Sequence, residues 1–383
     1  MKNKRVFLIR NTLPANYGGG ETYQIKLGLM LLENGFEPYI ITVSEGLLDD
    51  AKKKGMKVIE SPYIDRQNWS GWRNILFPVY FMKIMKLRRQ YRKLFKKYRP
   101  AVVNIQSRDD WIAATPVAKK MGIRVLWTDH MDFRSWVLTN INIWYKNWIG
   151  RWLLHSARKA DRIIMISDYE KKTFENLVGK DKSKNVEVIK NGAKDELKRY
   201  DNIRVMKNTF CYVGRIVDYK GIWELVEAFK IVVKKYSNAK LNIYGEGEVE
   251  KYKKMCDGCN GIVFHGRTEE PLKVLAENEA FVLPSYREGL SLSLLDAAMM
   301  GKKIIASDVD GNPEVVVDGE TGLLVPAKDA EKLAEAMIWM LEHRKEANEM
   351  AEKARKRYEK DFDFEKIFEE RMLPLYNNKK EKK

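Results

Sequence analysis

Short apolar runs alternate with longer segments of helical period along most of the chain. The apolar runs are rich in Val and Ile and are bounded by turn residues, which predicts strands. Near-continuous apolar strands that alternate with helices are typical of parallel sheets covered on both faces, so we expect an α/β protein. The predicted strands of the first half are 5–9, 38–43, 57–61, 101–106, 124–130, 162–167 and 186–192. Those of the second half are 209–215, 240–245, 261–266, 280–285, 302–308 and 322–326.

A polar stretch interrupts this rhythm near the middle of the chain. The chain has 383 residues, which is too long for one ordinary hydrophobic core. We therefore predict two doubly wound, Rossmann-like domains, at 1–192 and 208–360, joined by a linker over 193–207. An amphipathic helix is predicted over 361–377. In such sheets ligands bind at the carboxyl ends of the strands, so the loops there carry the candidate chemistry.

The first strand-end loop of the second domain contains two cations five residues apart. Gly214 and Arg215 end a predicted strand, and Lys220 and Gly221 open a helix. An arginine fork and a lysine charge in this arrangement suit a diphosphate. A solvated turn in a lysine-rich chain is the alternative. Gly245, in the next loop, begins a Gly-x-Gly turn, which is either a nucleotide-type turn or simply a tight one.

A later strand-end loop places a carboxylate, Glu288, directly before a glycine and a helix. Gly289, Leu290 and Ser291 are predicted to form the first helical turn, whose free N–H groups suit a phosphate. Asp296 follows about two turns on, within reach of a ribose. Glu288 lies just outside the helix, where it can accept hydrogen bonds from neutral hydroxyls. The alternative is an N-terminal acid that only complements the helix dipole.

Together these stretches resemble the donor domain of retaining glycosyltransferases of family 4. The shared pattern is a G-R-x4-K-G turn, a G-x-G turn, an E-x7-E/D element, a glycine-rich P-E loop (311–314) and a GLLV strand (322–325). The resemblance implies the GT-B fold, with two Rossmann-like domains facing across a cleft and the C-terminal helix, 361–377, crossing back onto the first domain. The chain departs from the family at Asp296, where the family usually has Glu, and this leaves the nucleotide preference open.

The first domain carries two further landmarks of that family. Gly18 and Gly19 belong to a G-G-x-E element ending at Glu21, and the resemblance implies that their amides lie near the donor diphosphate. A plain glycine-rich turn is the alternative. His130 ends a predicted strand, and the resemblance implies that it contacts the donor sugar near the reaction centre. A turn histidine bonded to the backbone is the alternative.

The resemblance thus implies a catalytic set of Glu288, His130, Arg215 and Lys220. Glu288 is expected to bind hydroxyls of the donor sugar and to favour the oxocarbenium-like transition state, while Arg215 and Lys220 stabilise the departing nucleoside diphosphate. Closure of the two domains would assemble this site. Transfer is expected to retain the anomeric configuration and to use a UDP- or GDP-linked sugar.

No metal ion is expected to be essential, because in the resembled family Arg and Lys neutralise the phosphates. The sequence Asp308-Val309-Asp310 imitates a metal-binding DxD motif but falls in the glycine-rich loop. Cys256 and Cys259 form a lone CxxC without a second ligand pair, so we expect a surface turn there. The chain has only three cysteines, which fits a reducing compartment.

The net charge of +17 indicates an anionic partner. Nine basic residues and no acid lie between Lys83 and Arg99, and Trp144, Trp148 and Trp152 recur at four-residue spacing. Such stretches are typical of membrane interfaces, which predicts docking on an anionic membrane surface beside a glycan or lipid-linked acceptor. The alternative is that both stripes pack on the core of the first domain. The apolar stripe of the basic segment comprises Ile84, Leu87, Tyr91, Leu94 and Tyr98.

No standard nucleic-acid-binding motif is present, so nucleic acid is not expected as a partner. The sequence contains no secretory signal and no apolar stretch of membrane length, which predicts a cytoplasmic protein, peripheral on the inner face of the cell membrane.

The predicted function is sugar transfer in cell-surface polysaccharide or glycolipid biosynthesis. Two other classes stay open: a basic membrane-binding module with a degenerate GT-B fold, and a GT-B nucleotide-sugar epimerase or phosphorylase. The presence of Glu288, Arg215 and Lys220 together counts against the degenerate module.

Overall fold

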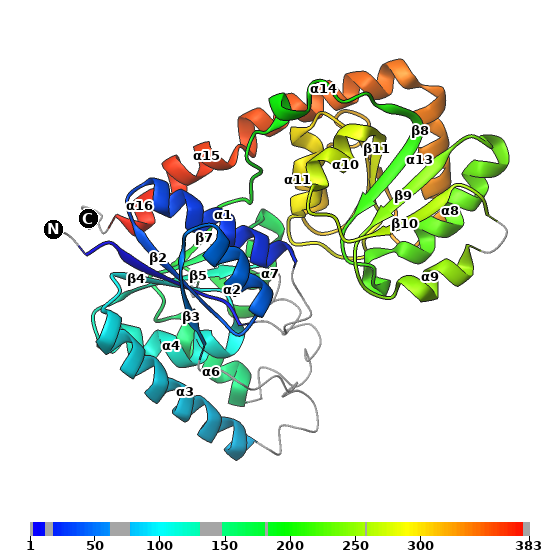
Figure 1. Cartoon of the computed structure of the whole chain (residues 1–383). Coiled ribbons are helices and arrows are strands. Elements are labelled where there is room, and N and C mark those ends of the chain that lie inside the picture. Colours follow the sequence, from blue (N-terminus) through cyan, green and yellow to red (C-terminus); the bar gives the residue numbers. More distant parts are fainter. Residues whose placement is uncertain are drawn as a thin grey trace. The chain divides into compact units, whose positions relative to one another are not determined.

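The computed structural model describes residues 3–11, 18–61, 77–130, 148–180, 183–256 and 259–377. The chain divides into two compact units, each with its own parallel sheet (Figure 1). Unit 1 comprises Met1–Ile189 and Phe368–Lys383, and unit 2 comprises Lys190–Ile367. All thirteen predicted strands are present in the described residues, so the α/β prediction is confirmed.

The sheet of unit 1 is parallel throughout, in the order β3-β2-β1-β4-β5-β6-β7. Its order reverses between β1 and β4, which is where doubly wound sheets bind ligands. The strands are β1 (Arg5–Ile9), β2 (Glu37–Thr42), β3 (Lys57–Glu60), β4 (Val102–Ile105), β5 (Arg124–Asp129), β6 (Arg162–Met165) and β7 (Val186–Val188).

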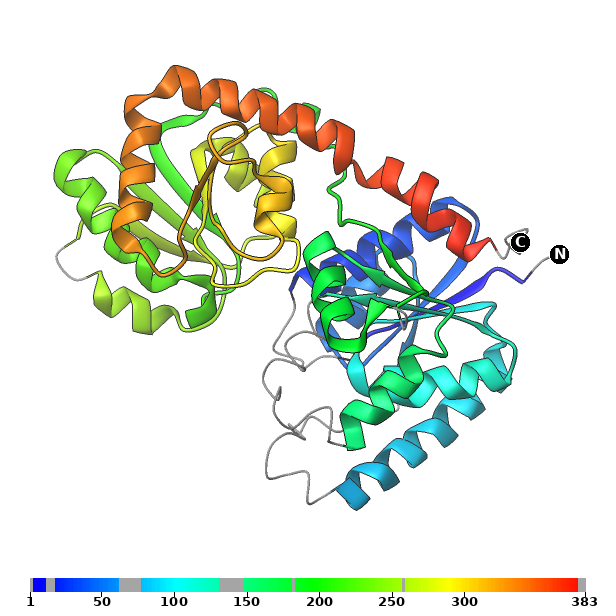
Figure 2. The same cartoon turned by 180° about the vertical axis from the view of Figure 1, so that it is seen from behind.

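Helices cover both faces of this sheet (Figures 1 and 2). The strands point their odd-numbered core residues, such as Phe7 and Val103, toward the face that carries α3, α4, α6 and α7. The helices are α1 (Gly19–Glu33), α2 (Glu45–Lys53), α3 (Phe77–Tyr98), α4 (Arg108–Lys120), α6 (Trp148–Ala157), α7 (Asp168–Val178) and, at the C-terminal end, α16 (Leu373–Tyr376).

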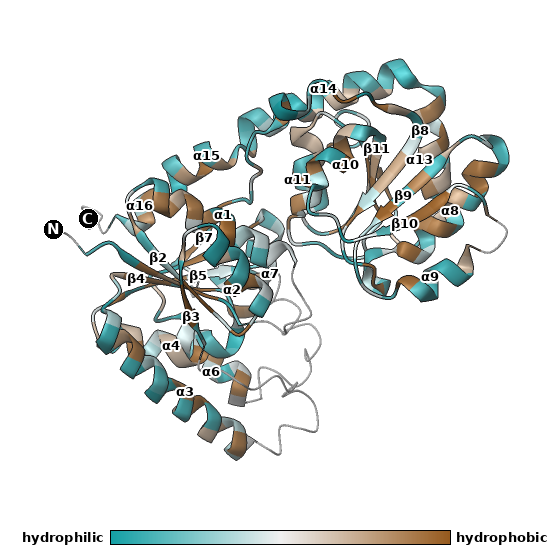
Figure 3. Ribbon diagram, viewed as in Figure 1, coloured by the Kyte–Doolittle hydropathy of each residue, from teal (hydrophilic) through white to brown (hydrophobic). Residues whose placement is uncertain are grey.

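The sheet of unit 2 is also parallel, in the order β10-β9-β8-β11-β12-β13, and it reverses between β8 and β11. Its strands are β8 (Met206–Val213), β9 (Lys240–Tyr244), β10 (Ile262–Gly266), β11 (Asn278–Leu283), β12 (Lys303–Ser307) and β13 (Leu323–Val325). The central strands of the sheet in unit 1 are largely apolar, whereas much of α3 and of α14 is polar (Figure 3).

Two layers of helices enclose the sheet of unit 2: α8 packs against α13, and α11 packs against α14. The helices are α8 (Ile222–Lys235), α9 (Val249–Met255), α10 (Pro271–Glu277), α11 (Leu292–Met299), α12 (Asn312–Val315), α13 (Ala330–Glu342), α14 (Arg344–Asp361) and α15 (Phe364–Ile367).

Two predicted segments, the linker and the C-terminal helix, differ from the structure in detail. The predicted linker over 193–207 contains a 3₁₀ turn, Leu197–Tyr200, with Tyr200 buried, and its last two residues already belong to β8. The predicted helix over 361–377 is broken after α14. There Ala193 pairs with the chain on both sides of Asp363, with Ala193 N–H donating to Phe362 O at 3.1 Å and Phe364 N–H donating to Ala193 O at 3.0 Å. These backbone groups are therefore bonded to Ala193, in an isolated β-bridge, rather than within a continuous helix. A π-helical turn, Phe368–Met372, then leads into α16.

The basic segment forms α3, and its apolar stripe packs on the core of unit 1. This is the alternative that the sequence left open beside membrane docking. Ile84, Leu87 and Tyr91 are buried, and Leu94 and Tyr98 are partly buried against the same core. The sequence pattern missed Tyr80 and Phe95, which are buried on the same face of α3. Among the helices of the described residues, none has the length and apolarity needed to cross a membrane.

Candidate functional site

Three strand-end loops meet in unit 2, after β8, β11 and β12, around the point where the strand order reverses. The first two are held together by a hydrogen bond from Tyr286 N–H to Tyr219 O at 2.8 Å. Gly221 has φ +70°, and a Cβ there would lie 1.9 Å from Pro284 O. Only glycine therefore allows the Lys220 loop and the Glu288 loop to approach this closely.

Glu288 is the centre of this cluster. Its Oε1 accepts hydrogen bonds from Lys220 Nζ at 2.6 Å and from Ser285 Oγ at 2.7 Å. Its backbone N–H donates to Asp310 Oδ2 at 2.9 Å, in the loop after β12. The side chains of Glu288 and Lys220 are only 8% and 15% exposed. Glu288 is thus positioned by all three loops, and the two predicted site residues form one buried ion pair.

Arg215 lies in the same loop as Lys220 but is exposed. Its guanidinium donates to the hydroxyl of Tyr219 and lies 5.6 Å from the centroid of that ring. The structure therefore brings Arg215, Lys220 and Glu288 together. Asp310, which the sequence offered only as a false metal motif, instead supports the backbone of Glu288.

The helix after Glu288 begins later than predicted. Ser291 is its N-cap with extended backbone, α11 starts at Leu292, and Gly289 and Leu290 precede the helix. Leu290 is buried, and its carbonyl accepts a hydrogen bond from Asn191 Nδ2 at 3.2 Å. Ser291 Oγ pairs with Ser293 Oγ at 3.1 Å and does not cap the helix, so the N–H groups of the first turn face the Glu288 loop without a side-chain cap. Asp296 is half-buried in the second turn of α11.

Gly214 and Gly245 lie at adjacent strand ends. A Cβ on Gly245 would lie 1.8 Å from Gly214 O, and the N–H of Gly245 already donates to Gly266 O at 2.8 Å. The absence of a side chain at Gly245 therefore lets the loops after β8 and β9 pack against each other, which supports the tight-turn reading of this motif.

Unit 1 carries a second polar cluster, at the carboxyl end of β1. Gly18 is the N-cap of α1, and its N–H donates to Glu21 Oε2 at 3.0 Å. Glu21 Oε1 accepts from Arg10 Nε at 2.7 Å, and Arg10 Nη1 donates to Gln106 O at 3.3 Å. Both charged side chains are buried. The glycine turn that begins α1 with Gly18 and Gly19 is thus held by a buried ion pair. The sequence analysis missed Arg10, although a cation directly after an apolar strand was the available signal.

His130 follows β5 and makes an edge-on contact with Tyr23, at 4.7 Å between ring centroids. Burial, together with the charge of Arg10, holds the pKa of His130 well below its ordinary value. The imidazole is therefore neutral at pH 7 and presents one donor and one acceptor. Its Nε2 is buried and has no hydrogen-bond partner among the residues that the structure describes.

Two glutamines in unit 1 were also missed. The side-chain amides of Gln24, on α1, and Gln106, directly after β4, are buried and have no hydrogen-bond partner within the described ranges. Leaving such groups unsatisfied costs about 1–3 kcal/mol each. They share an edge of the sheet with Arg10 and His130, because all follow or flank the carboxyl ends of β1, β4 and β5.

A further polar cluster fastens α3 to the start of α4. Asp110 accepts hydrogen bonds from Tyr91 OH and from Asn11 Nδ2, both at 2.6 Å. Burial raises the pKa of Asp110 to about 6. Tyr91, predicted as part of a surface-seeking stripe, is therefore a hydrogen-bonded core residue.

The remaining predictions concern metals and tryptophans. In the part of the chain that the structure describes, no group of three or more His, Cys, Asp or Glu side chains could hold a metal ion. Trp144 and the side chain of Trp148 lie outside the described residues. Trp152 is partly buried and stacks on Phe81 of α3, with ring centroids 5.5 Å apart.

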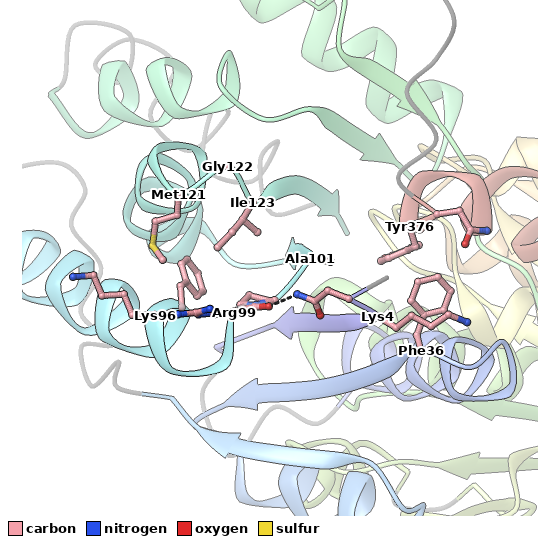
Figure 4. Close-up of a pocket in the computed structure, with 13 residues that line it drawn as sticks. Lys4, Phe36, Lys96, Arg99, Ala101, Met121, Gly122, Ile123 and Tyr376 are labelled. Carbon is pink, nitrogen blue, oxygen red and sulfur yellow. Dashed lines mark hydrogen bonds between the residues drawn. The ribbon is translucent and has the colours of Figure 1, made fainter. Parts of the chain in front are cut away.

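A cavity lies at a different place in unit 1. A cavity of about 800 Å³ opens at the amino-terminal edge of the sheet of unit 1 (Figure 4). It is bordered by residues that precede β1, β4 and β5, including Lys4, Arg99 and Ile123, and by Tyr376 of α16. It is therefore at the opposite edge of the sheet from Arg10, Gln106 and His130.

Two family models match adjacent parts of the chain. The model described as Glycosyltransferase Family 4 matches residues 17–197, and the model described as Glycosyl transferases group 1 matches residues 193–357. The first covers the Gly18 turn and His130, and the second covers the whole Glu288 cluster. The chain belongs to glycosyltransferase family 4.

Individual relatives agree with this family. The chain is similar to the capsular polysaccharide biosynthesis glycosyltransferase CapM of Staphylococcus aureus, with 33% identity over 43% of this chain and 45% of CapM. The alignment thus spans less than half of CapM. The chain is also similar to an uncharacterized glycosyltransferase, MJ1059 of Methanocaldococcus jannaschii, with 28% identity over 75% of this chain and 82% of that protein.

Solved structures share the fold of this family 4 chain. Anabaena Alr3699/HepE in complex with UDP and glucose matches with a TM-score of 0.75 and 14% identity, over 97% of this chain and 99% of that chain. The predicted GT-B fold, with two Rossmann-like domains, is thereby confirmed.

Proposed function

We propose that this family 4 chain is an active, retaining glycosyltransferase that moves a sugar from a UDP- or GDP-linked donor to a glycan or lipid-linked acceptor. The observation that carries the proposal is the buried Lys220–Glu288 pair, held by three loops at the point where the strand order reverses. The match to CapM favours cell-surface polysaccharide or glycolipid synthesis as the setting.

Each group in the cluster has a role in sugar transfer. Glu288 has one oxygen bonded to Lys220 and Ser285, so its other oxygen is the one to accept hydrogen bonds from sugar hydroxyls. That carboxylate also favours the positive charge that develops on the sugar ring in the transition state. Lys220 and Arg215 stabilise the negative charge on the departing diphosphate, together with the first N–H groups of α11.

Unit 1 supplies neutral polar groups suited to hydroxyls. His130 is uncharged at pH 7, and the buried amides of Gln24 and Gln106 offer further donors and acceptors. Because the cations of the cluster in unit 2 serve the phosphates, we propose that no metal ion is essential.

Release of the free nucleotide from a panel of UDP-, GDP- and ADP-sugars, measured with EDTA present, tests this function. We expect release from one UDP- or GDP-sugar and expect EDTA to leave the rate unchanged. Loss of release in EDTA, restored by Mg²⁺, would contradict the metal-independent mechanism. Conversion of the donor into another nucleotide sugar would indicate an epimerase, and release that requires inorganic phosphate would indicate a phosphorylase.

We also propose that α3 docks on an anionic membrane surface. Although its stripe is buried, the first half of α3 exposes Val79, Phe81, Met82 and Met85, and Met82 is 63% exposed. Exposed cations, including Lys83 and Lys86, lie among them. Apolar side chains beside basic ones are typical of helices that lie in a membrane interface.

Met82→Glu is expected to weaken binding to vesicles that contain anionic lipids at least tenfold. Burial of a Met side chain contributes about 1.5–3 kcal/mol, and the new carboxylate is repelled by the anionic surface. Co-sedimentation measures the binding. Ile231→Glu, which makes the same kind of change at an exposed apolar residue of α8 in unit 2, is the matched control and should bind as the wild type does. Equal loss in both variants, or in neither, would contradict the assignment to α3.

A further inference from the structure

Three cations surround one tyrosine ring in the cluster of unit 2. The guanidinium carbon of Arg287 lies 4.9 Å from the centroid of Tyr219, that of Arg215 lies 5.6 Å away, and Lys220 Nζ lies 5.7 Å away. Arg287 immediately precedes Glu288 and belongs to the loop after β11, whereas the other two cations belong to the loop after β8. The Tyr219 ring therefore collects positive charge from both loops.

The charges of these three groups are not balanced in the same way. Lys220 is neutralised by Glu288 at 2.6 Å, in a pair that is largely buried. Arg215 and Arg287 are both exposed, and neither forms an ion pair with a carboxylate within the residues that the structure describes. The uncompensated positive charge at this site thus belongs to two arginines, only one of which the family pattern identifies.

Both arginines lie against Tyr219, a residue that is bonded to both loops. Tyr219 O accepts the N–H of Tyr286, so the ring is anchored between the two loops. Arg215 donates to the Tyr219 hydroxyl, and Arg287 lies against the same ring. Two guanidinium groups near one ring repel each other, and a multiply charged anion between or beside them removes that repulsion. A phosphate group suits this arrangement because a guanidinium fork can donate two parallel hydrogen bonds to its oxygens.

We infer that Arg287, with Arg215, forms a phosphate-binding grip on the Tyr219 platform, and that its ligand is a diphosphate. The inference rests on the proposed function and adds a binding residue to it. Two sources carry this chemistry: the diphosphate of the nucleotide donor and the diphosphate of a lipid-linked acceptor. Lys220 is already paired with Glu288, so the two arginines supply most of the uncompensated charge for this diphosphate.

Calorimetric titration of Arg287→Ala tests the grip with three probes: UDP, GDP and geranyl diphosphate. Loss of a charge-assisted bidentate contact is expected to weaken diphosphate binding about tenfold or more. Arg287→Lys should recover only part of the affinity, because an ammonium cannot donate in the fork geometry. Since Arg287 is exposed, the melting temperature should match that of the wild type.

Arg204→Ala is the matched control. Arg204 is an exposed arginine of unit 2 that precedes β8, so it lies at the amino end of the strand whose carboxyl end carries Arg215. The Arg204→Ala substitution removes the same charge and should leave the affinities for UDP, GDP and geranyl diphosphate unchanged. If Arg204→Ala and Arg287→Ala weaken diphosphate binding equally, the effect comes from net charge alone and the inference is overturned.

The two sources of diphosphate give different results. Weaker binding of UDP or GDP in Arg287→Ala assigns the grip to the donor. Weaker binding of geranyl diphosphate alone, with nucleotide binding unchanged, assigns it to the acceptor. Unchanged binding of every probe that the wild type binds overturns the inference but leaves the proposed function standing.

The proposed function can also fail while the phosphate-binding grip stands. Weaker diphosphate binding in Arg287→Ala, without nucleotide release from any donor by the wild type, would support the grip and reject the transferase activity. A wild-type protein that binds none of the three probes would overturn both.

Discussion

Glu288→Gln is expected to lower the turnover of sugar transfer by about 100-fold or more, the loss typical of removing one charge-stabilising group from an active site. The same substitution should leave UDP or GDP binding equal or tighter. The carboxylate currently neutralises Lys220 through a 2.6 Å hydrogen bond, so its removal frees a cation beside the phosphate site. Catalysis and product binding are therefore expected to change in opposite directions, which simple misfolding would not produce.

Steady-state release of nucleotide and calorimetric titration with UDP or GDP measure the two effects. Glu320→Gln, at an exposed turn of unit 2, is the matched control and should leave both unchanged. Turnover of Glu288→Gln within a few-fold of the wild type would remove Glu288 from the catalytic set. A parallel loss of turnover and of nucleotide binding would instead show that the pair is needed to shape the phosphate site.

Arg10→Met is expected to destabilise unit 1 by about 3–5 kcal/mol, because it leaves a buried carboxylate without its partner. Glu21 is only 2% exposed, and its Oε1 accepts from Arg10 Nε at 2.7 Å. A loss of this size corresponds to a fall of roughly 10 °C in the melting temperature of a unit of this length. Calorimetry together with hydrogen exchange of peptides from unit 1 measures the change, because the two units need not unfold together.

The double variant Arg10→Met/Glu21→Leu separates stability from function. Replacing both members of a buried ion pair with apolar residues is often neutral or stabilising, so most of the lost stability should return. Turnover should stay low, because Gly18 N–H loses its acceptor and the turn that begins α1 is no longer held. Full recovery of turnover would show that the pair acts only through stability.

Arg5→Met provides the control for this pair. Arg5 and Glu37 form an exposed ion pair at 3.0 Å in the same unit. Exposed pairs contribute at most about 1 kcal/mol, so the melting temperature should fall by no more than a few degrees. A loss as large as that of Arg10→Met would mean that burial does not set the cost.

The position of Glu288 could be predicted from the sequence, but the start of the helix that follows it could not. A carboxylate followed by glycine, at the end of an apolar strand, was sufficient to place Glu288 in a strand-end loop, because strand and turn preferences depend on neighbouring residues. The local sequence does not predict the exact start of the helix, because a contact distant in the sequence is involved. The carbonyl of Leu290 is bonded to Asn191, about a hundred residues away, and the helix begins only at Leu292.

The basic helix shows the opposite case. Its apolar spacing predicted a stripe, but the spacing does not say whether core or membrane covers the stripe. The structure buries Ile84, Leu87 and Tyr91 on unit 1 and bonds Tyr91 to Asp110. The exposed apolar residues, among them Phe81 and Met82, lie off the predicted stripe.

The sequence by itself determined the order of strands and helices, the division into two parallel-sheet units and the strand-end loops that carry the chemistry. These follow from local periodicity and turn residues, which each segment carries in its own letters. Only the tertiary structure paired Lys220 with Glu288, Arg10 with Gln106, and Arg287 with Arg215 around Tyr219. Such pairings arise where crossovers bring the carboxyl ends of non-consecutive strands side by side, and local pattern does not specify which loop side chains then meet.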